Sequence, residues 1–470
     1  MSSKLSALLS ALLLISCSSV QEKTDYVLDW KGDGIGVEVT VRSQMDTLYF
    51  IYASENGGQK DQMTWFQDFS ATDGRVSVDT STRIITIIPE KGTARFSYVV
   101  RCTLPEGYGS PGGCIMDVFR PDIDSDMLFS RTENIFAVPQ DNEDMKAGVK
   151  WSSVPPYPVF CMYNPGKGAD PFEGTTGDIA WSVMVGDPLL TLDTVVVNGK
   201  VNYLATALRK NVELNKKKLK EYYRTFYGTV SSFWGDEDTE PYSMLFFPFR
   251  NNTWEATGNG FTNGFFSRYD ATADTLLNKS RRDLFTHEIG HKWLNNGPIW
   301  FPEGFNEMQT AYQLVASGIE SPEYFATYFN IALSGLWHSP YRNVPDEEAE
   351  ERFWEDGDYI WLLYWRGFSY AFHLAGVYEK ETGNPNAWKP MMEAVRPFLD
   401  DFSAEKFLDA MGGLMDRERL DREYKKYILD GNDFDFSPED LPSGCRMVYL
   451  SDGTPQLEVT DSAVFMKHFQ

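Results

Sequence analysis

The sequence predicts an α+β protein in which an N-terminal β-sheet domain precedes a mainly helical domain that carries a small edge sheet. Residues 25–208 contain short alternating or β-branched apolar runs separated by turn residues, which is the pattern of strands. From residue 209 onward, apolar residues recur at helical spacing. The chain has 470 residues. A single hydrophobic core rarely serves a chain of this length, so two domains are expected.

The composition narrows the class of function. The chain is 42% hydrophobic and carries a net charge of −25, and its acidic residues are spread along the sequence. Recognition of nucleic-acid phosphates requires basic patches. The charge therefore excludes nucleic-acid binding as the main function, whereas the composition leaves the oligomeric state open.

The first residues have the pattern of an export signal. One lysine and a short apolar run precede Cys17 in MSSKLSALLSALLLISC, and the run is shorter than the ~20 residues that span a bilayer. The segment resembles the lipobox of bacterial lipoproteins, which implies cleavage before Cys17 and a lipid anchor on its thiol. We expect residues 1–16 to be a signal peptide and the protein to be tethered in the cell envelope, on its periplasmic or surface face. An ordinary signal peptide or an uncleaved anchor is the alternative.

Residues 17–208 are expected to form the N-terminal β domain. The clearest strands are 35–41, 47–53 and 83–88, and Asn198-Gly199 between apolar runs predicts a two-residue hairpin turn. Two disulfides or free buried thiols are both compatible with the later cysteines. The turn-rich loop between Cys102 and Cys114 favours that pair; the cysteines after the signal are Cys102, Cys114, Cys161 and Cys445.

Residues 209–432 are expected to form the second domain. An amphipathic helix at 216–234 is followed by strands near 242–249 and 258–269. Further helices are expected at 321–336, 359–381 and 404–429. The last segment, 433–470, is rich in Asp, Pro and Gly and is expected to be an appended tail.

One stretch between these strands and helices carries metal-ligand spacing, LFTHEIGHKWLNNGPIWFPEGFNE at 284–307. Residues four apart lie on one face of a helix, so His287 and His291 can offer two imidazole nitrogens to one ion. Glu288 lies between them and is not needed as a ligand, which leaves a carboxylate free to act as a general base. The spacing predicts a zinc site with hydrolytic chemistry.

The residues after the second histidine predict that the chain reverses. Asn296 and Gly297 suit a left-handed helix end, and Pro298 cannot continue a helix. A second helix is expected from about Pro302 to about residue 315. Because the connection is short, the two helices are expected to pack as antiparallel neighbours.

The first turn of this second helix contains two glutamates. Glu303 is expected to come back against the histidines as the third metal ligand. Glu307 lies one turn later on the same side and is expected to accept the free ring N–H of a ligand histidine, which fixes the tautomer of that ring.

These motifs resemble the HExxHxW and WxxEGF patterns of the gluzincin metallopeptidases, above all the aminopeptidase N and glycyl aminopeptidase group. The resemblance implies a thermolysin-like catalytic domain at 209–432, a Zn²⁺ cofactor and a peptide or protein substrate. The spacer between His291 and Glu303 is eleven residues, shorter than in the aminopeptidase N group, so substrate preference is not carried over. The matching positions are His287, Glu288, His291, Trp293, Asn296, Trp300, Glu303, Gly304 and Phe305.

Two further segments resemble parts of the same family. Residues 364–367, Tyr-Trp-Arg-Gly, are similar to YxKG, which implies that Tyr364 supports the oxyanion, although Arg366 replaces the lysine. A buried aromatic helix is the alternative for this segment. The glycine-rich residues 258–264 occupy the place of GxMEN but lack its glutamate, which binds the free amine of the substrate. Residues expected to line the substrate here are Gly260, Phe261, Thr262 and Asn263.

Together these features predict a zinc metallopeptidase with aminopeptidase-like action. Glu288 is expected to take a proton from the attacking water and to pass it to the leaving amine, while Tyr364 donates to the oxyanion. An endopeptidase of the same fold is one alternative. The other is a non-catalytic surface lipoprotein whose zinc site is structural or decayed.

Overall fold

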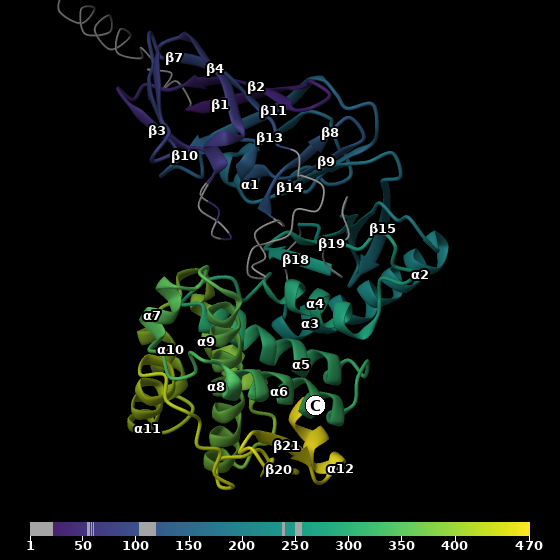
Figure 1. The fold of residues 1–470 in the computed structure, drawn as a ribbon, viewed down its shortest axis with the longest axis vertical. Helices are drawn as coiled ribbons and strands as arrows, with labels where there is room; N and C mark the ends of the chain where they lie inside the picture. The colour runs from purple at the N-terminus through teal and green to yellow at the C-terminus, as the bar shows by residue number, and fades with distance from the viewer. Residues whose placement is uncertain are drawn as a thin grey trace, which may run out of the picture.

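A computed structural model describes residues 22–470 except 54–56, 58, 60, 103–118, 237–239 and 250–255. Strands fill the N-terminal half and helices the C-terminal half (Figure 1), which confirms the predicted α+β class. Cys17 and Cys114 lie outside the described residues, so the lipid anchor and the expected cysteine pair remain predictions. Among the described residues, Cys102, Cys161 and Cys445 form no disulfide with one another.

Two sheets form the outer part of the N-terminal half. Alternate residues of their strands are buried, because each sheet turns one face to the shared core; Val37 and Val39 of β2 are examples. The six-stranded sheet has the order β13-β11-β1-β2-β7-β4, and the four-stranded sheet has the order β10-β3-β6-β5. The bounds are β1 (Lys23–Trp30), β2 (Ile35–Arg42), β3 (Leu48–Ile51), β4 (Phe66–Asp73), β5 (Arg75–Asp79), β6 (Ile84–Ile88), β7 (Thr93–Val100), β10 (Val138–Pro139), β11 (Lys146–Ser153) and β13 (Phe172–Thr175).

A third sheet joins this half to the rest of the molecule. Its order is β12-β14-β9-β8, from β12 (Val159–Cys161), β14 (Val183–Gly186), β9 (Met127–Arg131) and β8 (Asp122–Asp124). Phe129 of β9 packs on Phe247 and Phe266 of the next sheet. Beside them, Arg268 Nη2 lies 3.1 Å from Asp122 Oδ2, and both side chains are 0% exposed. This contact links the two sheets. Removing one partner of such a pair would leave the other charge buried and unpaired, at a cost of about 3–5 kcal/mol.

The five-stranded sheet corrects the expected domain boundary at residue 208. Its order is β15-β16-β17-β19-β18, and β16 pairs in parallel with β17, so β15 and β16 belong to the second domain. Val195 and Leu204 accordingly share a core with the helices. The bounds are β15 (Thr191–Val197), β16 (Lys200–Thr206), β17 (Ser243–Pro248), β18 (Ala256–Phe261) and β19 (Gly264–Tyr269). The predicted hairpin turn joins β15 to β16 with positive φ at Asn198 and Gly199.

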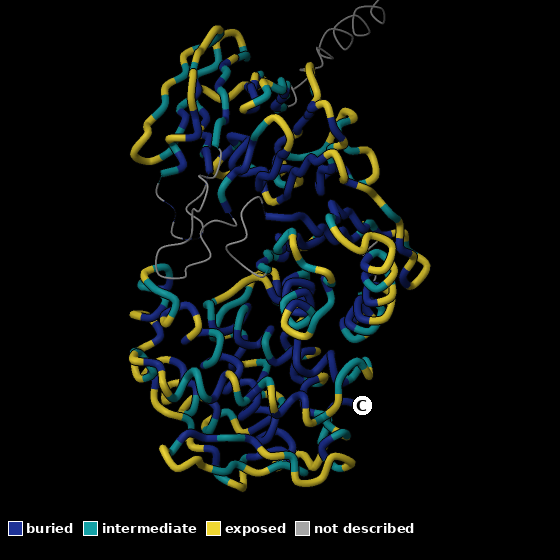
Figure 2. The backbone as a smooth tube through the Cα atoms, turned by 45° about the vertical axis from the view of Figure 1, so that its right-hand side comes forward, coloured by how far each residue is buried: buried dark blue, intermediate teal, exposed yellow. Residues whose placement is uncertain are grey.

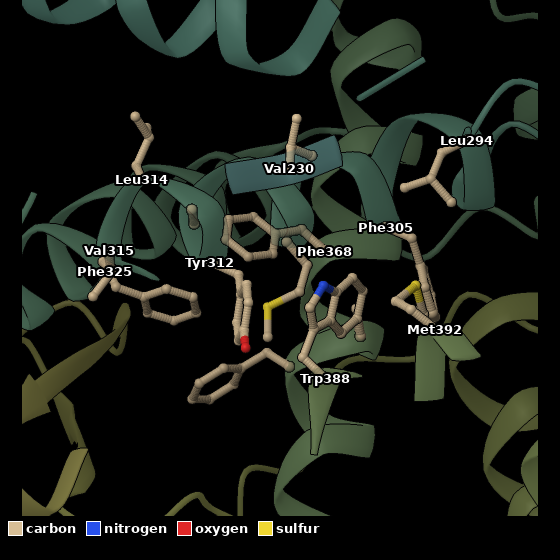
Figure 3. Packing of buried hydrophobic residues seen from close by; sticks show 14 of the residues in the cluster. Val230, Leu294, Phe305, Tyr312, Leu314, Val315, Phe325, Phe368, Trp388 and Met392 are labelled. Carbon is tan, nitrogen blue, oxygen red and sulfur yellow. The ribbon is translucent and has the colours of Figure 1, made fainter. Parts of the chain in front are cut away.

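The helical lobe is built around a large aromatic core, part of which Figure 3 shows around Trp388, Phe305 and Phe368. Its backbone is buried inside and exposed along the rim (Figure 2). No helix in the described ranges has both the length and the apolar character needed to cross a bilayer. The bounds are α2 (Val212–Tyr222), α3 (Gly228–Trp234), α4 (Lys279–Gly290), α5 (Asn306–Ala316), α6 (Pro322–His338), α7 (Asp346–Glu351), α8 (Gly357–Thr382), α9 (Trp388–Val395), α10 (Ala404–Gly412) and α11 (Arg417–Glu423).

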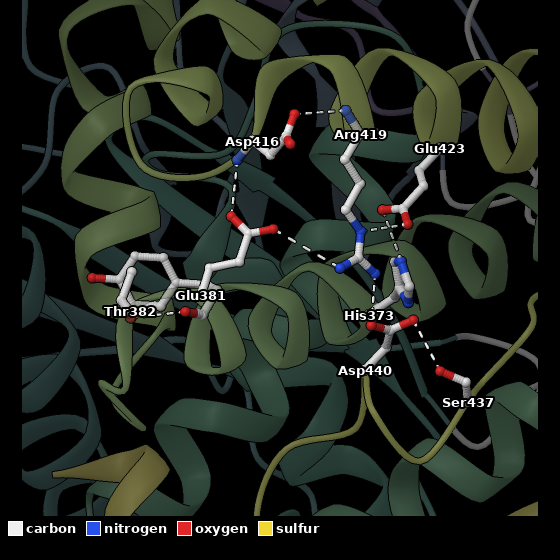
Figure 4. Close-up of polar contacts among 9 residues, drawn as sticks. His373, Glu381, Thr382, Asp416, Arg419, Glu423, Ser437 and Asp440 are labelled. Atoms are coloured by element: carbon white, nitrogen blue, oxygen red, sulfur yellow. Dashed lines mark hydrogen bonds and ion pairs between the residues drawn. The ribbon is translucent and has the colours of Figure 1, made fainter.

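The expected C-terminal tail is instead an integral part of this lobe. β20 (Cys445–Tyr449) and β21 (Pro455–Val459) form a hairpin, and α12 (Ser462–Phe465) follows it. Phe465 lies in the main core. Arg419 Nη2 donates to Asp440 Oδ1 at 2.6 Å and Arg419 Nε donates to Glu423 Oε1 at 2.8 Å (Figure 4). The sequence suggested a tail because the composition of the segment does not reveal its contacts, which are with residues far away in the chain.

Two glycines allow a π-helical turn, η6 (Trp300–Phe305), to lie directly on α8. A Cβ atom built on Gly304 would lie 2.4 Å from Gly367 Cα, and one built on Gly367 would lie 2.0 Å from the carbonyl oxygen of Trp300. No side chain fits between two backbones this close. The contact fixes the position of Glu303, in η6, relative to Tyr364, in α8.

Gly367→Ala is expected to lower the thermal unfolding midpoint clearly, because the new methyl group meets backbone that cannot rotate away. Overpacking of a core costs about 1–3 kcal/mol, and more where backbone must move. Gly228→Ala in α3 is the matched control, since its Cβ would lie 3.5 Å from Val197 Cγ1, an ordinary contact. Equal midpoints for Gly367→Ala and the parent would contradict this account of the η6–α8 contact.

Candidate metal centre

Helix α4 carries both histidines of the predicted site. Asn278 caps its N-terminus by accepting a hydrogen bond from the Arg281 backbone N–H at 2.9 Å, and Phe285 and Ile289 anchor it in the core. The helix ends at Gly290, earlier than the predicted end near Asn296, and His291 is its C-terminal cap. The end comes early because the next residues form a tight turn.

This turn orients the second histidine. His291 Nδ1 lies 2.9 Å from the carbonyl oxygen of Leu294. A carbonyl can only accept, so Nδ1 carries the proton and the lone pair of the ring is on Nε2.

Glu303 returns against the two histidines from η6. Its Oε2 lies 3.1 Å from His287 Nε2 and 3.5 Å from His291 Nε2, and the two Nε2 atoms are 3.1 Å apart. In the part of the chain that the structure describes, this is the one group of three or more His, Cys, Asp or Glu residues whose donor atoms converge in this way. Two imidazole nitrogens and a carboxylate oxygen are the ligands of a catalytic zinc site, so these residues fit a zinc ion.

Glu307 and Asn306 hold the first histidine from behind. Glu307 Oε1 lies 2.9 Å from His287 Nδ1, and the hydroxyl of Tyr328, from α6, donates to the other carboxylate oxygen of Glu307. Asn306 Nδ2 donates to the backbone carbonyl of His287 at 2.8 Å. A carboxylate at Nδ1 keeps the proton there and leaves Nε2 of His287 for a metal ion.

Glu288 lies beside the ligands and is not one of them. Its carboxylate is buried, and its Oε2 has no hydrogen-bond partner. Burial raises the pKa of Glu288, and the two neighbouring imidazoles partly oppose that rise. The Gly260 backbone hydrogen-bonds to this carboxylate, and its Oε2 stays free. A buried carboxylate with a free oxygen is suited to proton transfer.

Tyr364 closes the site from α8. Its ring stacks on the ring of His287, with 5.6 Å between centroids and 17° between planes. Burial raises the pKa of Tyr364 well above its usual value, and the nearby Glu303 carboxylate adds to the rise, so the phenol is a neutral donor. The Arg366 side chain does not line the cleft. It is buried, and its Nη2 donates to the Val344 carbonyl at 2.6 Å. The buried-helix alternative therefore describes Arg366, and the oxyanion role of Tyr364 stays a prediction.

The glycine-rich strand β18 lies against α4 at the site, but its contact differs from the expected one. A Cβ on Gly260 would lie 2.3 Å from the backbone oxygen of Glu288, so this residue packs on the helix. Phe261 is buried in the core between the two domains, and Thr262 and Asn263 form the turn to β19. The structure does not bring these four residues to the cleft; the strand residues that line it are Thr257, Gly258 and Asn259.

The cleft has a volume of about 470 Å³ and extends from the donor atoms along α4, α6 and α8. Most of its lining was not predicted, although helical spacing places Asp283 one turn before His287. Burial raises the pKa of Asp283 to about 6. The lining residues that the sequence did not single out include Ser280, Asp283, Tyr328, Ile331, Ala332, Trp354, Trp361 and Phe368.

Known structures share this arrangement of domains. An aminopeptidase N family protein from Idiomarina loihiensis is similar, with a TM-score of 0.72 and 14% identity over 91% of this chain and 79% of that one. The chain has the fold of the M1 zinc metallopeptidases. Yeast LTA4 hydrolase in complex with bestatin has a TM-score of 0.54 and 16% identity, over 89% and 69% of the two chains. An M1 zinc metallopeptidase from Deinococcus radiodurans has a TM-score of 0.54 and 14% identity, over 90% and 96%.

At the level of sequence, no protein-family profile and no curated protein matches the chain. Among the further M1 structures, mutant forms of a two-domain M1 zinc metallopeptidase were solved with L-tryptophan and with L-arginine, at 14% and 15% identity. At these identities the likeness shows the M1 fold, and the chemistry of the site depends on this chain's own residues.

Glu307→Gln is expected to weaken zinc binding about 10–100-fold, because the amide is neutral and can present its NH₂ group to His287 Nδ1, so the ring is held less firmly in the tautomer that leaves Nε2 for the metal. Titration of the apo protein against a chromophoric zinc chelator measures the affinity. His338→Gln is the control, because that histidine is exposed and far from the ligands in the chain. An unchanged affinity in Glu307→Gln would show that Glu307 does not support the metal centre.

Proposed function

We propose that this protein is a zinc-dependent metallopeptidase with aminopeptidase-like action, and that it works outside the cytoplasm. One observation carries the proposal: the donor atoms of His287, His291 and Glu303 converge within one cleft. This cleft also holds the buried carboxylate of Glu288, whose Oε2 is free, and a neutral phenol. The M1 fold supports the same conclusion.

The three ligands account for the metal chemistry. A zinc ion held by them would supply a Lewis acid that polarises the scissile carbonyl and lowers the pKa of water to about 7. The two histidines are buried and Glu303 is partly buried, which limits water access and strengthens their electrostatic influence.

Glu288 carries the proton. Its carboxylate accepts a proton from the water that adds to the scissile carbonyl carbon, and then delivers that proton to the nitrogen of the leaving amine as the C–N bond breaks. The raised pKa of Glu288 suits both steps, because a more basic carboxylate takes up the proton more readily and still gives it to an amine.

Tyr364 stabilises the charge that develops on the carbonyl oxygen. Its hydroxyl is neutral and lies in the cleft beside His287. A neutral donor that is already positioned stabilises an oxyanion without the desolvation cost of a second charge. Figure 1 shows the source of this arrangement: α4 comes from beneath the five-stranded sheet, and α8 from the helical lobe.

Glu288→Gln is expected to retain zinc and to lower kcat about 10²–10⁴-fold, because the amide cannot accept the proton. Zinc content by elemental analysis and hydrolysis of a fluorogenic peptide library give the two readouts. Glu213→Gln, in the exposed first turn of α2, is the control. Rapid hydrolysis by zinc-loaded Glu288→Gln would remove the general base from the mechanism.

An endopeptidase is the second candidate, because strand β18 carries no acidic side chain to bind a free amine, its sequence being ATGNGF. Matched peptides with free and acetylated amino termini separate the two functions. The aminopeptidase proposal predicts cleavage of the first residue from the free peptides and at least about tenfold slower cleavage of the acetylated ones. Equal rates, with internal cleavage, would favour the endopeptidase.

Location outside the cytoplasm rests on the signal-like sequence and the cysteine at residue 17. We propose that a lipid on Cys17 anchors the protein in the cell envelope. Cys17→Ala is expected to abolish metabolic labelling with a radioactive fatty acid and to release the protein from the membrane fraction. Labelling that persists in this variant would refute the anchor.

A further inference from the structure

The cleft has a polar end at the metal centre and an apolar remainder. Its apolar wall comes from three helices: Leu284 from α4, Ile331 and Ala332 from α6, and Trp361, Trp365 and Phe368 from α8. The cleft volume of about 470 Å³ lies within the range of sites that enclose a small ligand or a few residues of a peptide. The cleft as a whole is therefore large enough for a substrate side chain beside the metal centre.

Two tryptophans of α8 form the part of this wall that continues from Tyr364. Trp361 and Trp365 are one turn apart on α8 and stack with 6.1 Å between centroids and 15° between planes. Trp361 also packs edge-on against Tyr364 at 5.2 Å. Trp365 is held against α6 because Gly335 has no side chain, and a Cβ there would lie 2.4 Å from its ring. We call Trp361, Trp365 and Ile331 the apolar shelf.

The shelf leaves apolar surface open to the cleft. Ile331 is 63% exposed and Trp361 is 45% exposed, and both line the cleft. Exposed apolar side chains grouped beside a site are typical of ligand-binding surfaces. Because Tyr364 contacts both His287 and Trp361, the shelf continues directly from the site that would hold the scissile bond.

The charges of the cleft disfavour acidic ligands. The described lining residues include four carboxylates and no lysine or arginine; the carboxylates are Asp283, Glu288, Glu303 and Glu307. Glu303 is a ligand of the metal centre and Glu307 holds a ligand histidine, which leaves the other two facing the cleft. An aspartate or glutamate side chain in the substrate would meet like charge here.

We infer that this protein selects peptides that carry a large apolar or aromatic side chain next to the scissile bond, and that this side chain lies on the apolar shelf. The inference rests on the proposed function and adds the substrate class. A single methylene in an apolar pocket changes selectivity about 10–200-fold. A phenylalanine is therefore expected to be preferred over a glycine by at least about tenfold.

Binding to the zinc-loaded Glu288→Gln variant tests this without turnover. The probes are tetra-alanine peptides in which one residue, at the first or the second position, is replaced by Phe, Gly or Asp. Isothermal titration is expected to show that the best Phe peptide binds at least about tenfold more tightly than its Gly counterpart. The Asp peptide is expected to bind most weakly, because Asp283 still lines the cleft in this variant. Adding Trp361→Ala or Ile331→Ser is expected to remove most of the Phe preference.

Trp181→Ala is the matched control, because Trp181 is 47% exposed in the N-terminal half and does not line the cleft. It is expected to keep the full Phe preference. Equal affinity for the Phe and Gly peptides, no measurable binding of any of them, or a preference that survives both shelf variants, would overturn the inference. Hydrolysis by the parent without a Phe preference would overturn the inference alone, whereas a Phe preference in binding without hydrolysis by the parent would overturn the proposed function alone.

Discussion

The metal centre depends on two backbone contacts that only glycine permits. At Gly304 and Gly367 the turn η6 lies directly on α8, and at Gly260 strand β18 lies on α4. Each residue of the centre therefore comes from an element whose position is fixed by backbone packing. These contacts bring the donor atoms of Glu303 and the two histidines together.

The N-terminal half supports the cleft from the other side. Arg131, at the end of β9, donates to Asn259 Oδ1 at 3.1 Å, and Asn259 lines the cleft from β18. The same guanidinium donates to Glu133 at 2.9 Å, so it is held from both ends. Together with the buried pair between Arg268 and Asp122, these contacts make the β domain a support for the edge strand of the catalytic sheet.

The sequence predicted what depends on local spacing and missed what depends on distant pairing. His287, His291 and Glu288 follow from one helical turn, and Glu303 and Glu307 follow from a short reversal of the chain. The domain boundary was placed too late because the sequences of β15 and β16 resemble those of the preceding strands. Only the pairing of β16 with β17 assigns this hairpin to the five-stranded sheet of the second domain. The cleft lining and the integrated C-terminal segment likewise depend on contacts between residues far apart in the chain.

The most direct test of the account is the zinc-edge anomalous scattering of crystals of the zinc-loaded protein. The account predicts one strong peak in the cleft, about 2.0–2.2 Å from His287 Nε2, His291 Nε2 and a carboxylate oxygen of Glu303. A fully zinc-loaded crystal in which the peak lies elsewhere, or in which Glu303 makes no bond to the metal, would contradict it.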